Sequence, residues 1–277
     1  MNNSLVNTQW LSDHIDDPNL IILDASSSQN KSGLQSHYSD ICIKHARSIS
    51  LKSTFSAQST EMPNTLLSPD SFQKEARTLG INNNNNIVVY DNLGIYTSPR
   101  VWWMFKAMGL NNIAVLDGGL PQWVKDGYHT VAINNDTYSE GNFTVKPDTS
   151  LVKSMQDILE NINYISATVL DARSYGRFCG TAPEPRKGLI SGHIPNSRSL
   201  PFKDVLNGIK MKPKEELLEI FTTRGIQGEN LIFTCGSGLT ACITYLAADL
   251  ALKNKKAIYD GSWTEWSQKQ EGLISKK

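Results

Sequence analysis

The sequence predicts an α/β protein of two tandem domains, each a mainly parallel sheet flanked by helices. Short apolar runs rich in β-branched residues alternate with longer segments of helix formers, a pattern typical of parallel sheets covered on both faces. At 277 residues the chain exceeds the common size of a single domain. An internal repeat, described next, divides it in two.

Three landmarks of the first half return in the same order about 145 residues later. The matched pairs are 20–25 with 169–173, 87–91 with 231–235, and 114–123 with 257–266. We therefore expect a first domain over 1–135, a linker over 136–150 and a second domain over 151–277. The linker is expected because that stretch is polar and contains a glycine and a proline.

The elements of each half follow from local patterns. In the first half, the apolar runs 20–25 and 87–91 predict buried strands. Ser98-Pro99 is a typical helix start, because a serine hydroxyl can cap the helix and proline suits its first turn. Residues 101–105 are apolar nearly all round, as in a helix packed under a sheet. In the second half, 231–234 predicts a buried strand and 241–252 a helix.

Between that last strand and helix lies the stretch Cys235-Gly236-Ser237-Gly238-Leu239-Thr240. Its two glycines let the backbone bend tightly and turn N–H groups inward. Inward amides and the start of the following helix favour an anion at the loop centre, so we expect Cys235 to be held as a thiolate. A cysteine that only packs does not need these glycines. The first half has Asp91 at the equivalent strand end, so we expect one reactive site per chain.

The composition excludes several classes of function. Lys+Arg and Asp+Glu are equal at 27 each, so no net charge draws the chain to nucleic acid or to an anionic membrane. No stretch approaches the roughly 20 apolar residues of a membrane span, and the first residues lack a signal-peptide pattern. The four cysteines form no C-x-x-C pair, which argues against a zinc site. We expect a reduced, cytoplasmic protein without metal or cofactor.

Two arginines in the loop that precedes the cysteine stretch are candidate binding residues. Arg177 and Arg186 lie in a segment with two prolines and two glycines, and a guanidinium can hold a carboxylate or oxyanion in a bidentate fashion. Arg173 follows the strand-end Asp171 and equally suits a structural ion pair. We interpret His193, in a Gly-His-Ile-Pro turn, as a structural hydrogen-bonding residue.

Three reactions suit a nucleophilic cysteine in an amide-lined loop. Phosphate-ester hydrolysis needs an arginine six positions after the cysteine, where this chain has Ala241. A Cys-His hydrolase needs a histidine that activates sulfur, and no sequence feature ties any of the five histidines to Cys235. Sulfur transfer through a cysteine persulfide needs only a thiolate, an amide cradle and groups that orient the donor. The sequence favours this third reaction.

The stretch 235–242 closely resembles the active-site loop of the 3-mercaptopyruvate sulfurtransferases, a branch of the tandem rhodanese family. The similarity spans nearly the whole chain and includes 90–91, 99–105, 116–119, 176–186, 192–195 and 259–263. It implies two rhodanese-like domains, the first non-catalytic and the second catalytic.

The resemblance also implies a role for each candidate residue. Cys235 would carry the persulfide, and the Ser237 hydroxyl would assist the chemistry. The cradle would consist of Gly236, Gly238, Leu239 and Thr240. Arg177 and Arg186 would bind the carboxylate of the donor.

The residues after the cysteine bear on the donor. Relatives that prefer thiosulfate carry a basic pair there, whereas Gly236 and Ser237 are neutral. We therefore expect 3-mercaptopyruvate as donor, pyruvate as product, and a thiol such as thioredoxin or a small thiol, or cyanide, as acceptor. A thiosulfate:cyanide sulfurtransferase (rhodanese) and a non-catalytic module that binds partners or senses oxidants are the alternatives.

The sequence departs from the family at two places. Residues 51–55 lack the acidic residue, and residues 62–64 the histidine, that mercaptopyruvate-type relatives tend to carry. Cys179 stands where relatives often have a further arginine. A proton relay through Ser237 that uses those partners is therefore not expected, and the donor is expected to be held less firmly.

Overall fold

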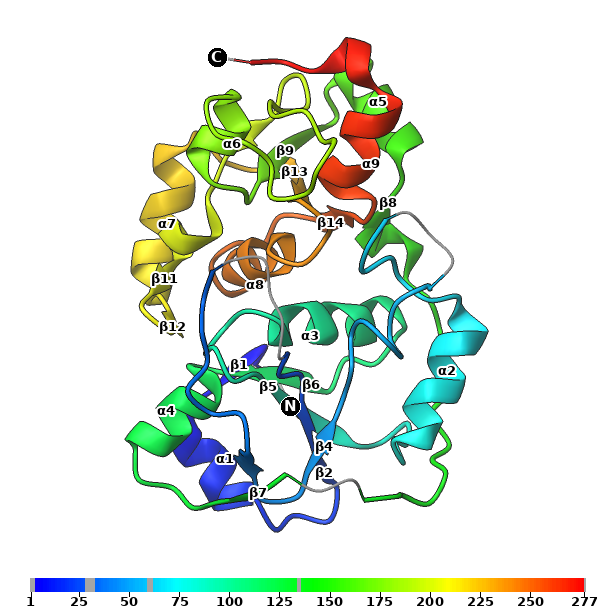
Figure 1. Cartoon of the computed structure of the whole chain (residues 1–277), viewed down its shortest axis with the longest axis vertical. Coiled ribbons are helices and arrows are strands. Elements are labelled where there is room, and N and C mark those ends of the chain that lie inside the picture. The colour runs from blue at the N-terminus through cyan, green and yellow to red at the C-terminus, as the bar shows by residue number, and fades with distance from the viewer. Residues whose placement is uncertain (1–2, 28–32, 59–61, 134–135, 277) are drawn as a thin grey trace. The chain divides into compact units, whose positions relative to one another are not determined.

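The computed structural model describes residues 3–27, 33–58, 62–133 and 136–276. The chain forms two compact units, drawn in Figure 1. The first consists of 1–59, 66–148 and 208–211, and the second of 60–65, 149–207 and 212–277. Of the described residues, 62–65 therefore belong to the second unit, although most of the surrounding sequence belongs to the first.

The first unit is built on a five-stranded parallel sheet with the strand order β1-β6-β5-β2-β4. Its strands are β1 (Leu5–Val6), β2 (Leu20–Asp24), β4 (Ala46–Ser48), β5 (Asn86–Tyr90) and β6 (Ile113–Leu116). A separate antiparallel pair joins β3 (Ile41–Ile43) and β7 (Thr130–Ala132). In the central pair, Asp24 lies opposite Tyr90, so both strands end at the same edge of the sheet.

Helices cover both faces of this sheet. The helices are α1 (Thr8–His14), α2 (Pro69–Thr78), α3 (Ser98–Ala107) and α4 (Gly119–Lys125). Leu11 of α1 and Trp123 of α4 share one apolar core with Val88 of β5. Helix α3 also contacts β5 and β6, and its Phe105 packs edge-on against Phe72 of α2.

The second unit repeats this arrangement with the strand order β10-β9-β13-β14-β8. Its strands are β8 (Val152–Lys153), β9 (Ala167–Asp171), β10 (Arg198–Ser199), β13 (Asn230–Thr234) and β14 (Lys256–Tyr259). Its helices are α5 (Met155–Tyr164), α6 (Tyr175–Cys179), α7 (Lys214–Thr223), α8 (Ala241–Ala251) and α9 (Ser262–Lys269). The remaining short elements are β11 (Leu206–Asn207), β12 (Lys210–Met211), η1 (Thr149–Leu151), η2 (Phe202–Val205) and η3 (Glu271–Leu273).

The predicted fold class and internal repeat are confirmed. Read from β8, the second sheet has the same order of strands as the first sheet read from β1. Even an unusual backbone feature is repeated, because the first residue of α4, Gly119, has φ +53° and the first residue of α9, Ser262, has φ +52°. These are left-handed values, which a serine adopts only where its surroundings impose them.

The prediction for the start of α3 is correct in position and wrong in its cause. The helix begins at Ser98, and residues 101–105 are buried as expected. The N-cap is Thr97, however, and its side chain makes no capping hydrogen bond. The Ser98 hydroxyl instead donates to Oδ2 of Asp91 at 2.6 Å, because an ionised carboxylate is the stronger acceptor.

Residues 143–146 are attached to the first unit by main-chain hydrogen bonds. Phe143 is buried, and its main-chain nitrogen donates to the carbonyl of Ile81 at 3.0 Å. Lys146 N donates to Met108 O at the same distance. Within the described ranges, no helix is both long enough and apolar enough to cross a membrane.

Candidate active site

Cys235 lies directly after β13, the middle strand of the second sheet. Open parallel sheets bind ligands beyond the carboxyl ends of their strands, and this is such an end. The main-chain oxygen of Cys235 accepts from Trp263 N at 2.9 Å, and its main-chain nitrogen donates to Ser262 Oγ at 3.4 Å. The cysteine is 1% exposed. The first residues of α9, the helix that follows the neighbouring strand β14, therefore hold the backbone of Cys235 in place.

The loop from Cys235 to α8 has the tight path that its glycines predict. Gly238 has φ +74°, a left-handed conformation in which glycine is favoured. Its carbonyl accepts from Cys242 Sγ at 3.2 Å, while Leu239 O accepts from Cys242 N at 3.1 Å. Thr240 is the N-cap residue of α8. Cys242 is thus a buried residue of the helix that helps to shape the loop.

The corresponding loop of the first unit holds an anion in an amide cradle. Oδ2 of Asp91 accepts from the main-chain nitrogens of Tyr96, Thr97 and Ser98 at 2.8 to 2.9 Å. Its Oδ1 accepts from Leu93 N at 2.9 Å. Asp91 is fully buried, so these donors replace the water that the carboxylate has lost. The repeat equates Asp91 with Cys235, and at the same offset the four donors match positions 237, 240, 241 and 242. The amide of Cys242 donates to Leu239 O instead, so the amides of 237, 240 and 241 are the expected donors.

Gly236 is closely approached by both predicted arginines. A Cβ atom added to Gly236 would lie 3.0 Å from Arg177 Nη2 and 3.6 Å from Arg186 Nη1. The carbonyl of Gly236 is held by Thr264, whose Oγ1 and N donate to it at 2.6 and 3.0 Å. The absence of a side chain at 236 thus leaves room for two guanidinium groups next to the cysteine.

Arg177 also forms a bidentate ion pair that the sequence did not indicate. Its Nη2 lies 2.5 Å from Oε2 of Glu184, and its Nε donates to Oε1 at 3.1 Å. The Glu184 side chain is 1% exposed and that of Arg177 is 21% exposed. Glu184 therefore fixes the orientation of the guanidinium that reaches Gly236.

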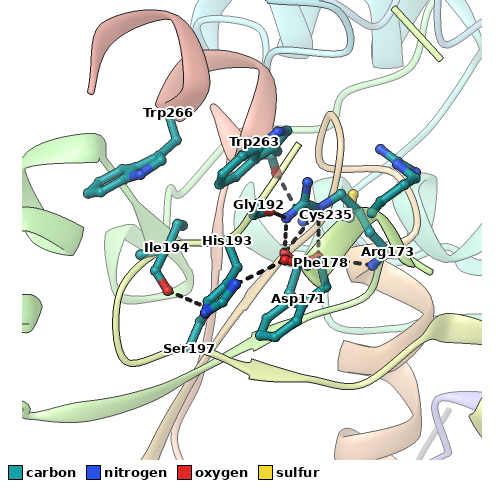
Figure 2. A network of polar contacts seen from close by, with 12 residues as sticks. Asp171, Arg173, Phe178, Gly192, His193, Ile194, Ser197, Cys235, Trp263 and Trp266 are labelled. Carbon is teal, nitrogen blue, oxygen red and sulfur yellow. Dashed lines mark hydrogen bonds and ion pairs between the residues drawn. The ribbon is translucent and has the colours of Figure 1, made fainter. Parts of the chain in front are cut away.

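The open question about Arg173 is answered by a buried network, shown in Figure 2. Its Nη2 contacts Oδ2 of Asp171 at 2.5 Å and the carbonyl of Gly192 at 2.6 Å, and its Nη1 contacts Oε1 of Glu184 at 2.8 Å. Its guanidinium also stacks 4.1 Å from the ring centre of Trp263. Burial alone would lower the pKa of Arg173, but the two carboxylates outweigh it and raise that pKa. Arg173 is a structural ion-pair residue.

His193 has the structural surroundings expected of it. Its Nδ1 lies 2.9 Å from the carbonyl of Phe178, and its ring stacks on the Phe178 ring at a centroid distance of 4.0 Å (Figure 2). Its main chain pairs in both directions with Ser275. These contacts tie the turn before β10 to α6.

Ser237 lies close to Arg186, which is another predicted site residue, and to Asn64, which was not among the predicted site residues. Arg186 Nη2 lies 3.1 Å from Ser237 Oγ, and Asn64 Nδ2 lies 3.0 Å from the same atom. Asn64 has φ +64° and belongs to the second unit. The sequence offered one signal, the absence of a histidine from residues 62–64 where relatives have one.

The candidate site thus brings three arginines close to Cys235 and its loop. Arg173 and Arg177 pair with the buried carboxylates of Asp171 and Glu184, and Arg186 contacts the Ser237 hydroxyl. Across the described ranges, His, Cys, Asp and Glu form no cluster of three or more that could hold a metal ion. The arrangement suits attack by sulfur on a small anionic molecule.

Comparison with known proteins places these features in a family. The model of the rhodanese-like domain matches residues 7–126 and 151–269. Thiosulfate/3-mercaptopyruvate sulfurtransferase 2 of Arabidopsis thaliana is 36% identical over 96% of this chain and 84% of its own length. Thiosulfate sulfurtransferase of Cricetulus griseus is 37% identical over 95% of this chain and 91% of its own. A crystal structure of a 3-mercaptopyruvate sulfotransferase from Escherichia coli superposes with a TM-score of 0.81 at 30% identity, covering 95% of this chain and 99% of that one.

Proposed function

This chain belongs to the tandem-rhodanese family of sulfurtransferase enzymes, and we propose that 3-mercaptopyruvate is its sulfur donor. The observation that carries this proposal is the convergence of Arg177 and Arg186 on Gly236, with no charged side chain on Gly236 or Ser237. The positive charge therefore lies beside the cysteine loop and not within it. That position suits a carboxylate a few atoms away from the transferred sulfur, as in mercaptopyruvate.

The proposed reaction begins with the thiolate of Cys235 and the thiol sulfur of the donor. A sulfur–sulfur bond forms while the carbon–sulfur bond of the donor breaks, and the electron pair of that bond passes into the adjacent carbonyl as an enolate. The proton of the donor thiol ends on the enolate carbon, which gives pyruvate and leaves a persulfide anion on Cys235. Oxidation states balance without a cofactor, because one sulfur atom moves from carbon to sulfur.

The persulfide anion needs donors around it in a buried site. We propose that the amides of Ser237, Thr240 and Ala241 are these donors. Gly236, Gly238 and Leu239 complete the cradle, because the tight turns at the two glycines and the backbone of Leu239 give the loop its path. The four amides that hold the Asp91 carboxylate in the first unit support this assignment.

The second half of the reaction restores the enzyme. A thiol, such as that of thioredoxin or of a small molecule, or cyanide, attacks the outer sulfur and releases the Cys235 thiolate. A reduced compartment such as the cytoplasm is the proposed location. The structure describes all four cysteines, and none of them is paired in a disulfide.

Steady-state kinetics with two donors test the proposal. We expect kcat/KM for 3-mercaptopyruvate to exceed that for thiosulfate, with pyruvate formed in step with sulfur transfer. Mass spectrometry of donor-treated protein should find a gain of about 32 Da on Cys235, the mass of one sulfur. Cys235→Ser should abolish turnover and the adduct, whereas Cys42→Ala, at a cysteine of the first unit, should keep both.

Thiosulfate is the second candidate donor, because a relative of 37% identity is named thiosulfate sulfurtransferase. A kcat/KM for thiosulfate equal to or above that for mercaptopyruvate would favour it and reject our proposal. A protein that turns over neither donor, before and after Cys235→Ser, would instead be a binding or oxidant-sensing module.

A further inference from the structure

The hydroxyl of Ser237 is held by nitrogen atoms from two distant parts of the chain. Asn64 Nδ2 lies 3.0 Å from Oγ and also 3.2 Å from the main-chain oxygen of Ser237. Arg186 Nη2 lies 3.1 Å from the same Oγ. Ser237 itself is 7% exposed, so these contacts replace most of its contact with water.

The direction of each hydrogen bond follows from the chemistry of the groups. A main-chain carbonyl oxygen can only accept, so the Asn64 atom beside it is the amide nitrogen, which is a donor. The same nitrogen has a second hydrogen for Ser237 Oγ. A guanidinium has no acceptor, so Arg186 also donates to Oγ. Within the described part of the chain, Ser237 Oγ thus accepts from two N–H donors.

A serine hydroxyl has two acceptor lone pairs and one hydrogen. Because Asn64 and Arg186 occupy both lone pairs, the remaining capacity of Ser237 is its own O–H, which must point away from both nitrogens. Donation from a charged guanidinium also polarises the O–H bond and makes its hydrogen a better donor.

We propose that Asn64 is a positioning residue for the reaction. Together with Arg186 it orients the Ser237 hydroxyl so that its O–H donates a hydrogen bond to the bound mercaptopyruvate. The proposal rests on the proposed function. When the carbon–sulfur bond of mercaptopyruvate breaks, negative charge develops on the carbonyl oxygen as the enolate forms. The Ser237 O–H stabilises that oxygen by a hydrogen bond, without giving up its proton. No base is needed, and neither an amide nor a guanidinium could serve as one.

The backbone of Asn64 fits this role. Its φ of +64° is a left-handed value that asparagine tolerates better than other residues with a side chain. Asn196, in the same unit, has the same φ of +64°, and its side chain contacts Ile162 O at 3.5 Å. Asn196 therefore provides a matched control with the same backbone conformation and a different contact.

The variants are chosen to separate the hydrogen bond from the backbone. Asn64→Gly removes the amide and keeps a residue that accepts left-handed φ. Asn64→Asp keeps the shape and replaces the donor by an acceptor, which would draw the Ser237 hydrogen toward itself. Asn196→Gly is the control, and its kinetics should match those of the wild type.

With 3-mercaptopyruvate, Asn64→Gly should lower kcat by about 3- to 10-fold, the size of one hydrogen bond, and change KM little. Asn64→Asp should lower kcat more than Asn64→Gly. In a Ser237→Ala background, Asn64→Gly should cause no further loss, because the hydroxyl that it positions is gone.

A structural role would give a different pattern. If Asn64→Gly lowers kcat by the same factor with and without Ser237, or leaves kcat at the wild-type value, the inference is wrong. Failure of the proposed function is recognised separately, because the wild-type protein then fails to turn over mercaptopyruvate at all. That result would overturn both proposals, whereas an active wild type with unaffected Asn64 variants would overturn this one alone.

Discussion

Asp91 occupies in the first unit the place that Cys235 occupies in the second. Each follows the middle strand of its sheet, and each is held by the helix that follows the next strand. Leu120 N donates to the main-chain oxygen of Asp91 at 3.0 Å, and Trp263 N donates to that of Cys235 at 2.9 Å. The first loop thus holds a carboxylate, and the repeat places at the equivalent position the sulfur that we propose as the carrier of the transferred sulfur.

The Asp91 carboxylate should be a major source of stability for the first unit. It accepts four main-chain N–H bonds and the Ser98 hydroxyl, all in a buried position. Asp91→Ala would leave these donors without an acceptor, and we expect a loss of about 3–5 kcal/mol in the free energy of unfolding. Urea denaturation measures it, with Asp16→Ala, at a 70% exposed aspartate, as a control that should change little. Equal midpoints for the two variants would contradict this view of the loop.

Gly236 should be required because of what lies beside it. Gly236→Ala would place a Cβ 3.0 Å from Arg177 Nη2, so the guanidinium has to move by a few tenths of an ångström. We expect kcat/KM for mercaptopyruvate to fall by about tenfold, mainly through KM, because the carboxylate is then poorly placed. Gly228→Ala is the matched control, since a Cβ there would meet nothing within 4 Å. If Gly236→Ala has the same kinetics as Gly228→Ala, the position of the two arginines does not depend on the missing side chain at residue 236.

Much of the fold could be predicted because its signals are local. The strand runs and the glycines around Ser237 are visible in short windows, and each repeated landmark is itself such a run. The structure has these strands and this loop where the sequence indicated. The sheet edge at which Cys235 lies then follows from the parallel topology. The Ser98 hydroxyl shows the limit of local reasoning. It was expected to cap the helix, but it donates its hydrogen bond to the Asp91 carboxylate instead.

The side-chain partners within the site could not be predicted in this way. Asn64 is 173 residues away from Ser237, and an asparagine carries no charge or reactive group that would draw attention to it. Arg177 lies close to Gly236, but its pairing with Glu184 depends on the path of a loop with no repeating pattern. Such contacts are decided by tertiary packing.

Glu184 should hold the two inner arginines together. It is almost fully buried between Arg173 and Arg177, and it accepts from both. Glu184→Gln keeps the size of the side chain and removes its charge, so we expect unfolding free energy to fall by about 3 kcal/mol. Glu216 forms a more exposed pair with Lys212, so Glu216→Gln should lower the free energy of unfolding by less than about 1 kcal/mol. Urea denaturation compares them, and a similar small loss in both variants would mean that the buried charge is not needed.

The stability of the first unit should depend on pH through Asp24 and Tyr90. Burial raises the pKa of Asp24, so the folded chain keeps this proton to a higher pH than the unfolded chain, whose value is near 3.8. Stability from this group therefore falls as pH rises from 3.8 through the raised pKa, and the Tyr90 hydroxyl limits the fall by donating to Oδ2 at 2.9 Å.

Tyr90→Phe removes that donor and the acceptor of Ile43 N. We therefore expect the free energy of unfolding to fall by about 1–3 kcal/mol, and by more at neutral pH than in acid. Urea denaturation at both pH values checks this, with the exposed pair Tyr128–Gln9 as a control through Tyr128→Phe. A loss from Tyr90→Phe that is the same in acid and at neutral pH would exclude the Asp24 charge as its cause.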